Sequence, residues 1–254
     1  MPTVGFDKGL IPPADMLYDG SSSPEQFVLL GEGFCQQFLI ARAMLPPSGA
    51  VLDLGCGNGA VARALTRYLA SDGSYEGLDV HAGSVRWLTE NYKPYPNFTF
   101  THADVYSKFY NPMGKYQARE YVLPFRDHTF DVVLLKSVFT HMLPPDVRHY
   151  LQEIGRVLKP GGRSIVTYFL LNPESRRFMA AGLDKMSLQY HYEGDPSCLV
   201  ANLEVPEHVV AHDEVRIRTY YGEAGLVPCD LTFGDWCGRP SLIGLQDLIV
   251  AVKE

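Results

Sequence analysis

Five residues in one short turn have the types and spacing to bind a polar or charged ligand. Asp53 is followed by Gly55, Gly57 and Gly59, and Asn58 lies between the last two glycines. The glycines allow positive φ angles and let a ligand approach the backbone without meeting a Cβ atom. A carboxylate at position 53 would repel a pyrophosphate and attract a cation. The turn therefore favours a ligand that carries positive charge and no phosphate.

Two other interpretations of this turn remain open. With Ala60 included, the spacing reads Gly-x-Gly-x-x-Ala, which is typical of a dinucleotide-binding turn. A glycine turn can also serve the fold alone, without a ligand. Asp53 is the residue that discriminates among the three, because a phosphate-binding turn has no use for a carboxylate there.

The chain around the turn predicts the elements that would position these residues. Val51, Leu52 and Leu54 form an apolar run with the length of a buried parallel strand. Helical periodicity follows over Ala60–Leu69. The glycines therefore join the carboxyl end of a strand to the amino end of a helix, where the first N–H groups have no partner within the helix.

A second carboxylate is expected at the same edge of the sheet. Ser74–Val80 reads as the next strand, and Asp79 near its end lies about twenty residues after Gly59. Ligands of open parallel sheets lie across the carboxyl ends of the strands. Asp79 is thus placed to accept hydrogen bonds from both hydroxyls of a ribose. The alternative is that Asp79 only caps the helix predicted over Gly83–Tyr92.

The stretch Asp53-Leu54-Gly55-Cys56-Gly57-Asn58-Gly59 resembles motif I of the class I S-adenosylmethionine-dependent methyltransferases. S-adenosylmethionine has a sulfonium and an amino group and no phosphate, which agrees with the carboxylate of Asp53. The resemblance implies this compound as the cofactor. Its binding residues in this region would be Asp53, Gly55, Gly57, Asn58, Gly59, Asp79 and Val80.

Two later stretches resemble further motifs of the same family. Ala103-Asp104-Val105 follows a third predicted strand, and in the family such an acid accepts from the adenine amino group while the next N–H donates to the ring. This implies that Asp104 and Val105 contact adenine. Thr129–Ser137 reads as a strongly apolar fourth strand. Residues after that strand face the transferred methyl group in the family, so Lys136 and Ser137 are expected to line the cofactor site.

His141 is the candidate catalytic base. It lies one helical turn after Ser137, beside the expected path of the methyl group. An imidazole with an ordinary pKa of about 6.5 is partly neutral at physiological pH and can accept a proton. The alternative is a histidine packed at the start of a helix. His191 and His212 are weaker candidates for the same role.

The alternation of strands and helices predicts one α/β domain over residues 1–254, with a Rossmann-like doubly wound sheet of seven mostly parallel strands and helices on both faces. The resemblance implies that Leu226–Phe233 and Leu245–Val252 form an antiparallel hairpin at the sheet edge. The helix predicted over Pro144–Leu158 would pack on one face, because its apolar residues share a stripe.

Three segments outside this alternation are expected to shape the site. Residues 1–48 would form an N-terminal arm and a cap helix over Pro24–Leu45, with Tyr18-Asp19-Gly20 of the arm able to cover a pocket. The aromatic segment 103–121 is too long for an ordinary loop and would line a substrate pocket. Residues 172–212 hold aromatics and glycines at the ligand edge of the sheet, which predicts a substrate lid.

The composition limits the partners. The chain has a net charge of −7 and no run of Lys or Arg, which disfavours nucleic acid. No apolar run has the length of a membrane span, and the first residues lack a secretory pattern, so a cytoplasmic protein is expected. The five cysteines include no Cys-x-x-Cys pair, and no acidic cluster indicates a metal site. A homodimer is left open.

The resemblance implies methyl transfer, and looser similarities favour a particular acceptor. Asn172-Pro173-Glu174-Ser175 and Trp236-Cys237-Gly238-Arg239 resemble small-molecule methyltransferases of bacterial secondary metabolism and glycan tailoring. They favour transfer to a hydroxyl of a natural product or sugar. The alternatives are methylation of nitrogen or carbon, an NAD-dependent oxidoreductase, and a protein that binds the cofactor without catalysis.

Overall fold

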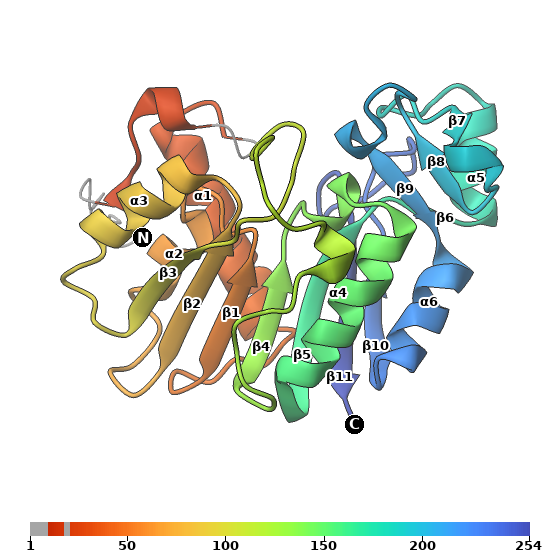
Figure 1. The fold of residues 1–254 in the computed structure, drawn as a ribbon. Helices are drawn as coiled ribbons and strands as arrows, with labels where there is room; N and C mark the ends of the chain where they lie inside the picture. The colour runs from red at the N-terminus through yellow and green to blue at the C-terminus, as the bar shows by residue number, and fades with distance from the viewer. Residues whose placement is uncertain (1–9, 18–20) are drawn as a thin grey trace.

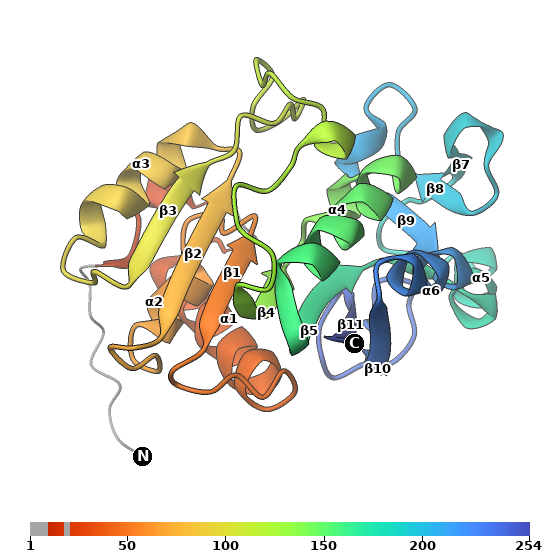
Figure 2. The same cartoon turned by 60° about the horizontal axis from the view of Figure 1, so that its bottom comes forward.

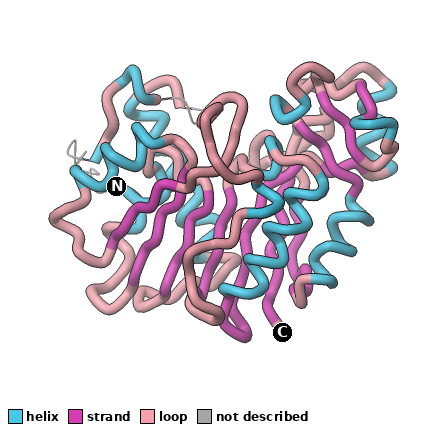
Figure 3. Tube along the Cα trace, viewed as in Figure 1, coloured by secondary structure: helices cyan, strands magenta, loops and turns pink. Residues whose placement is uncertain are grey.

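The computed structural model describes residues 10–17 and 21–254. Within them, a seven-stranded sheet runs in the order β10-β11-β5-β4-β1-β2-β3 (Figures 1 and 3). The first five strands along the chain are parallel, and β11 pairs antiparallel with both β5 and β10. This confirms the predicted mostly parallel sheet with an antiparallel edge hairpin. The strands are β1 (Ala50–Leu54), β2 (Ser74–Asp79), β3 (Phe98–His102), β4 (Phe130–Leu135), β5 (Leu158–Tyr168), β10 (Leu226–Thr232) and β11 (Asp247–Lys253).

Helices cover both faces of the sheet, because successive strand residues point to opposite sides (Figure 2). Val51 packs in one apolar cluster with α1, α2 and α3, while its neighbour Leu52 packs in another with α4 and α6. The helices in these two layers are α1 (Pro24–Phe34), α2 (Ala60–Leu65), α3 (Ala82–Asn91), α4 (Pro144–Val157) and α6 (Glu214–Glu223).

Two predicted helices end earlier than their apolar pattern indicates. The helix predicted over Pro24–Leu45 changes at Cys35 into the π-helical turn η3 (Cys35–Ile40). The helix predicted over Ala60–Leu69 stops as α2 at Leu65, and the hydroxyl of Thr66 donates to the carbonyl of Arg63 at 2.7 Å. The hydroxyl of Thr66 thus competes with the backbone N–H group that would donate to this carbonyl if the helix continued.

Segment 172–212, the predicted lid, contributes most of a second sheet. This sheet has the order β6-β9-β8-β7 and packs around its own apolar cluster, at the upper right of Figure 1. Asn172 and Ser175 form a capping box that starts α5 within the segment. The elements are β6 (Leu170–Leu171), α5 (Pro173–Ala180), β7 (Tyr190–His191), η6 (Tyr192–Gly194), β8 (Cys198–Val200), η7 (Pro206–His208) and β9 (Val210–Asp213).

The further 3-10 turns of the described residues include η2 (Ala14–Met16), η4 (Ala118–Glu120) and η5 (Phe139–His141). The prediction that residues 18–20 cover a pocket lies outside the described residues, as does much of the predicted arm. Across the part of the chain that is described, no helix combines the length and apolar character needed to cross a membrane.

Candidate active site

The glycine turn after β1 has the backbone conformation that its sequence predicts. Gly55, Gly57 and Gly59 have φ angles of 80°, 54° and 84°, which side chains with a Cβ atom rarely adopt. The space beside Gly55 is filled by the protein itself, since a Cβ atom there would lie 2.4 Å from Cγ2 of Val138. The first glycine is therefore required by packing as well as by conformation.

Asp53 is buried at the end of β1 and borders a cavity. It is 2% exposed and accepts a hydrogen bond of 2.6 Å from the hydroxyl of Tyr75. Burial raises the pKa of this carboxyl to about 7, while the hydrogen bond from Tyr75 and the charge of Lys136 oppose the rise. A cation bound beside Asp53 would favour the ionised form.

Asp79 ends β2 at the same edge of the sheet and holds the glycine turn. Its two carboxylate oxygens accept from the N–H of Gly57 at 2.7 Å and from the N–H of His81 at 2.8 Å. The cap of α3 is His81, whose side chain accepts from the N–H of Ser84. Asp79 is thus not the cap of the next helix. Burial raises its pKa, and the two N–H groups oppose that rise.

A cavity of about 410 Å³ opens at the carboxyl ends of β1, β2 and β4. The loop after β3 rises above these strand ends in Figure 1. Nine residues predicted from the sequence line the cavity: Asp53, Gly55, Gly57, Asp79, Val80, Val105, Lys136, Ser137 and His141. Residues from five separate stretches of sequence therefore meet at one place.

Three residues predicted to bind the cofactor do not line this cavity. The side chain of Asn58 is fully buried, accepting from the hydroxyl of Ser84 at 2.6 Å and donating to the carbonyl of Met16. Gly59 caps α2. Asp104 accepts from the N–H of Lys115 at 3.3 Å, which ties down the loop after β3. These contacts give all three a structural role, and ligand contact is not needed to explain their positions.

Ser137 stands in a strained conformation directly after the strand end of β4. Its φ angle is 60°, unusual for a residue with a Cβ atom. Its N–H donates to Oγ1 of Thr167 at 2.8 Å, and its hydroxyl donates to Oε1 of Gln246 at 3.1 Å. Gln246 also lines the cavity and comes from the turn before β11. The two bonds hold the wall between β4 and β11 in place.

His141 is positioned by a contact with segment 172–212. Its Nδ1 lies 3.1 Å from the carbonyl oxygen of Glu207. A carbonyl can only accept, so Nδ1 carries the proton in the neutral ring and Nε2 keeps a lone pair. Burial lowers the pKa of His141, which favours the neutral ring at neutral pH. The ring of Tyr110 approaches edge-on, with centroids 6.5 Å apart.

Comparison with known proteins agrees with this arrangement. Residues 52–166 match the family model described as "Methyltransferase domain". The chain is 28% identical over 135 residues to 2-phytyl-1,4-naphtoquinone methyltransferase of Nostoc sp., covering 52% of this chain and 51% of that protein. It is 34% identical over 112 residues to phthiotriol/phenolphthiotriol dimycocerosates methyltransferase of Mycobacterium tuberculosis, covering 44% of this chain and 34% of that protein.

The chain thus resembles the class I S-adenosylmethionine-dependent methyltransferases over residues 52–166. It spans about half the length of the first of these relatives and about a third of the second. Among solved structures, the PH0226 protein of Pyrococcus horikoshii matches with a TM-score of 0.59 at 18% identity, over 98% of this chain and all of that one. At that identity the likeness shows the fold alone.

The cavity fits the cofactor that this methyltransferase family implies. The amino-acid end of S-adenosylmethionine carries an ammonium and a carboxylate, and Asp53 and Lys136 supply one charge of the opposite sign to each. The carboxylate of Asp79 can accept from hydroxyls. Among the described residues, no group of three or more His, Cys, Asp or Glu side chains is arranged to hold a metal ion.

The other histidines considered from the sequence lie elsewhere in the methyltransferase. His212 is fully buried on β9 with Nε2 3.0 Å from the carbonyl of Phe139, and burial lowers its pKa to about 4. His191 is exposed on β7 and does not line the cavity. Of segment 172–212, Glu207 is the residue that reaches the cavity wall.

Several wall residues were not predicted individually. Tyr106 and Tyr110 come from the aromatic segment expected to line a pocket. Asp146 and Tyr150 lie four residues apart on α4, beside its apolar face, and this spacing was the available signal. Gln246 had no local signal, because its place depends on how β11 returns to the middle of the sheet.

Proposed function

We propose that this protein transfers the methyl group of S-adenosylmethionine to a hydroxyl group of a small molecule, a natural product or sugar, with His141 as the general base. The observation that carries the proposal is the contact between Nδ1 of His141 and the carbonyl of Glu207. It leaves Nε2 as a proton acceptor in the same cavity that Asp53 and Asp79 border. The naphtoquinone and phthiotriol methyltransferases among its relatives support a small-molecule acceptor.

The bound cofactor supplies an activated methyl group on a sulfonium. The protein's part is to hold the acceptor oxygen in line and to remove its proton. Asp79 would hold the ribose hydroxyls, Asp53 the ammonium, and Val80 and Val105 the adenine. Holding reactants in such a geometry supplies roughly 7–11 kcal/mol.

His141 takes the proton of the acceptor hydroxyl at Nε2. The resulting imidazolium keeps its Nδ1–H bond to the carbonyl of Glu207, which stabilises the charged ring. The loop after β3 and the turn η7 cover this end of the cavity. They meet where Nζ of Lys108 donates to the carbonyl of Glu204 at 3.0 Å.

The test is the variant His141→Ala, assayed with labelled S-adenosylmethionine and an acceptor found in extracts of a strain lacking the gene. General-base catalysis contributes typically 10²–10⁴ in rate, so kcat should fall by about that factor. Cofactor affinity, measured by calorimetry, should stay within about twofold. The exposed His191→Ala is the matched control and should leave kcat unchanged.

The pH–rate profile gives a second measurement. Because burial lowers the pKa of His141, kcat should rise with pH through an apparent pKa below the ordinary value of about 6.5. This limb should be absent from the residual rate of His141→Ala. A loss of less than about threefold in kcat would contradict the assignment of His141 as the base.

A further inference from the structure

One wall of the cavity is a polar pair on α4. Asp146 lies in the first turn of this helix and Tyr150 lies one turn later, and both line the cavity. Side chains four residues apart on a helix have Cβ atoms about 5–6 Å apart. A single small group can therefore contact both. His141 lines the same cavity shortly before the helix begins.

Tyr150 brings a buried donor to this wall. The residue is 6% exposed, and its ring packs edge-on against Phe139 with centroids 6.5 Å apart. Within residues 10–17 and 21–254, no hydrogen-bond partner of its hydroxyl is found. Burial raises the pKa of Tyr150, so the hydroxyl keeps its proton. Tyr150 lines the cavity, so a ligand bound there can supply an acceptor for this hydroxyl.

Asp146 brings an acceptor to the same wall. It is half-buried, and no Lys, Arg or His of the described chain forms an ion pair with it within 4.0 Å. Burial raises its pKa, while the N–H groups of Leu143 and Arg119 and the charge of Arg119 favour ionisation. Its place near the start of α4 also stabilises that helix. That structural role does not require Asp146 to border the cavity.

A hydroxyl group can bond to both residues at once, since the carboxylate of Asp146 can accept a further hydrogen bond beside those from Leu143 and Arg119. It donates its proton to the carboxylate of Asp146 and accepts from the hydroxyl of Tyr150. A carbonyl would place a lone pair against the carboxylate, and an ammonium has no acceptor for the tyrosine proton. This hydroxyl is distinct from the one at His141, which has to lose its proton.

We infer that Asp146 and Tyr150 select acceptors that carry a second hydroxyl group, so that the substrates are diols. The inference rests on the proposed function, because it assigns the acceptor of the same site. Two kinds of compound share this chemistry: aromatic diols of the catechol type and the diols of sugar-like rings.

The test measures binding to the full-length protein loaded with S-adenosylhomocysteine, the demethylated cofactor. Ligand-detected NMR titrations compare 1,2-dihydroxybenzene with phenol, and cis-1,2-cyclohexanediol with cyclohexanol. For at least one ring type, the diol should bind about tenfold more tightly than the single alcohol. The pair that shows this preference identifies the aromatic or the sugar-like source.

Tyr150→Phe and Asp146→Asn should each reduce the preference about threefold to tenfold, because each removes one hydrogen bond to the second hydroxyl. Binding of the single alcohol should change little. Tyr220→Phe and Asp127→Asn alter the same residue types outside the cavity and serve as matched controls. Circular dichroism checks that each variant folds, and either of the two cavity variants alone suffices for the comparison.

Equal binding of diol and single alcohol for both ring types would overturn the inference. So would a preference that survives in every folded cavity variant. This measurement needs no turnover, so it is independent of the His141→Ala assay. An inactive protein that still prefers diols would contradict the proposed function and leave the inference standing.

Discussion

At the scale of single residues, the buried Asp53 links cofactor binding to proton binding. Its carboxyl loses the hydration that normally stabilises the charge, and the hydroxyl of Tyr75 replaces only part of it. With a pKa of about 7, Asp53 binds a proton over a range in which an exposed aspartate is ionised. A cation at this position pulls the equilibrium back toward the carboxylate.

The affinity for S-adenosylmethionine should therefore depend on pH below neutrality. Between pH 7 and pH 5.5 the cofactor's amino group is charged while Asp53 takes up a proton. The dissociation constant should rise by up to about tenfold per pH unit as pH falls. Above pH 7 this dependence should level off. Isothermal titration calorimetry over this range measures it.

Asp53→Asn is the control, since it keeps the shape and removes the titration. The affinity of this variant for S-adenosylmethionine should be weaker at pH 7.5 and nearly constant down to pH 5.5.

The raised pKa of Asp53 also makes the free energy of unfolding of the cofactor-free protein fall as pH rises from about 4 to about 7, because the folded state disfavours the carboxylate. An identical pH dependence of cofactor binding in native protein and variant would contradict this role for Asp53.

Residue types and spacing predicted Asp53, Gly55, Gly57 and Asp79 because these residues lie at or just after strand ends within short stretches of sequence. Asp53, Asp79 and His141 reach one cavity as expected. Glu207 and Gln246 were missed because their contributions depend on tertiary structure. The backbone carbonyl of Glu207 orients His141. Every residue has such a carbonyl, so the residue type does not indicate this contact.

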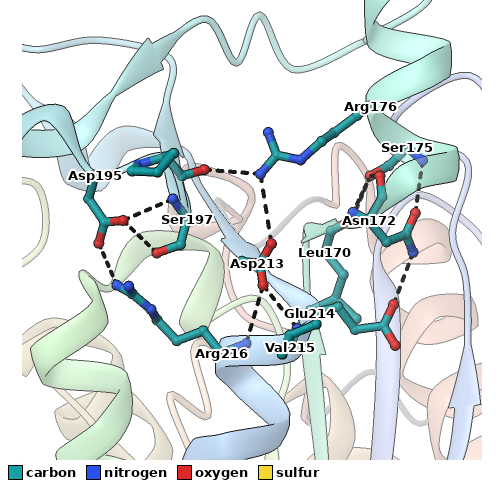
Figure 4. A network of polar contacts seen from close by, with 11 residues as sticks. Leu170, Asn172, Ser175, Arg176, Asp195, Ser197, Asp213, Glu214, Val215 and Arg216 are labelled. Carbon is teal, nitrogen blue, oxygen red and sulfur yellow. Dashed lines mark hydrogen bonds and ion pairs between the residues drawn. The ribbon is translucent and has the colours of Figure 1, made fainter.

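At the scale of elements, Asp213 joins the second sheet to α6. Figure 4 shows its carboxylate beside Arg176 and at the start of the helix. It accepts from the N–H groups of Val215 and Arg216, and its Oδ2 lies 3.8 Å from Nη2 of Arg176. The neighbouring Arg216 pairs with Asp195. The cap and the ion pairs therefore connect α5, the β7–β8 turn and α6.

Asp213→Ala should lower the free energy of unfolding by about 0.5–2 kcal/mol, because the first N–H groups of α6 lose their acceptor. Thermal and urea denaturation measure this loss. Cofactor affinity should stay the same, because Asp213 does not line the cavity. Asp213→Asn keeps a capping side chain and should recover most of the stability. Equal losses in both variants would assign the effect to the charge rather than to the cap.

Strands were predicted more accurately than helix ends. The central strands β1 and β4 are short apolar runs, and burial on both faces makes such runs easy to recognise. The early end of α2 depends on one hydroxyl, that of Thr66, and the change from α1 to η3 leaves the apolar pattern intact. The periodicity of apolar residues alone does not predict the early end of α2 or the change from α1 to η3.

At the scale of the whole molecule, two ion pairs join one end of segment 172–212 to the loop between β10 and β11. Lys185 pairs with Asp235 at 2.8 Å, and Glu174 pairs with the buried Arg239 at 3.3 Å. The end near the cavity is held by ring packing and by backbone carbonyls rather than by ion pairs. The ring of His208 packs against Phe109 with centroids 5.5 Å apart, and the carbonyl of Glu204 accepts from Lys108. The predicted lid is thus expected to move at residues 201–208 alone.

Limited proteolysis with a protease that cleaves after glutamate tests this expectation. Glu204 lies exposed in the loop before η7, whereas Glu193 lies exposed in the turn after β7 and does not line the cavity. Phe109→Ala removes one of the contacts that hold the loop, so it should speed cleavage after Glu204 about threefold or more and leave cleavage after Glu193 unchanged.

S-adenosylhomocysteine with 1,2-dihydroxybenzene should slow cleavage at Glu204 in the native protein, because a filled cavity favours the closed loop. Mass spectrometry of the fragments gives both rates from one digest, with Glu193 as the internal control. If cleavage at Glu204 responds neither to Phe109→Ala nor to the ligands, this part of the wall is fixed, and acceptors would have to enter elsewhere along the cavity.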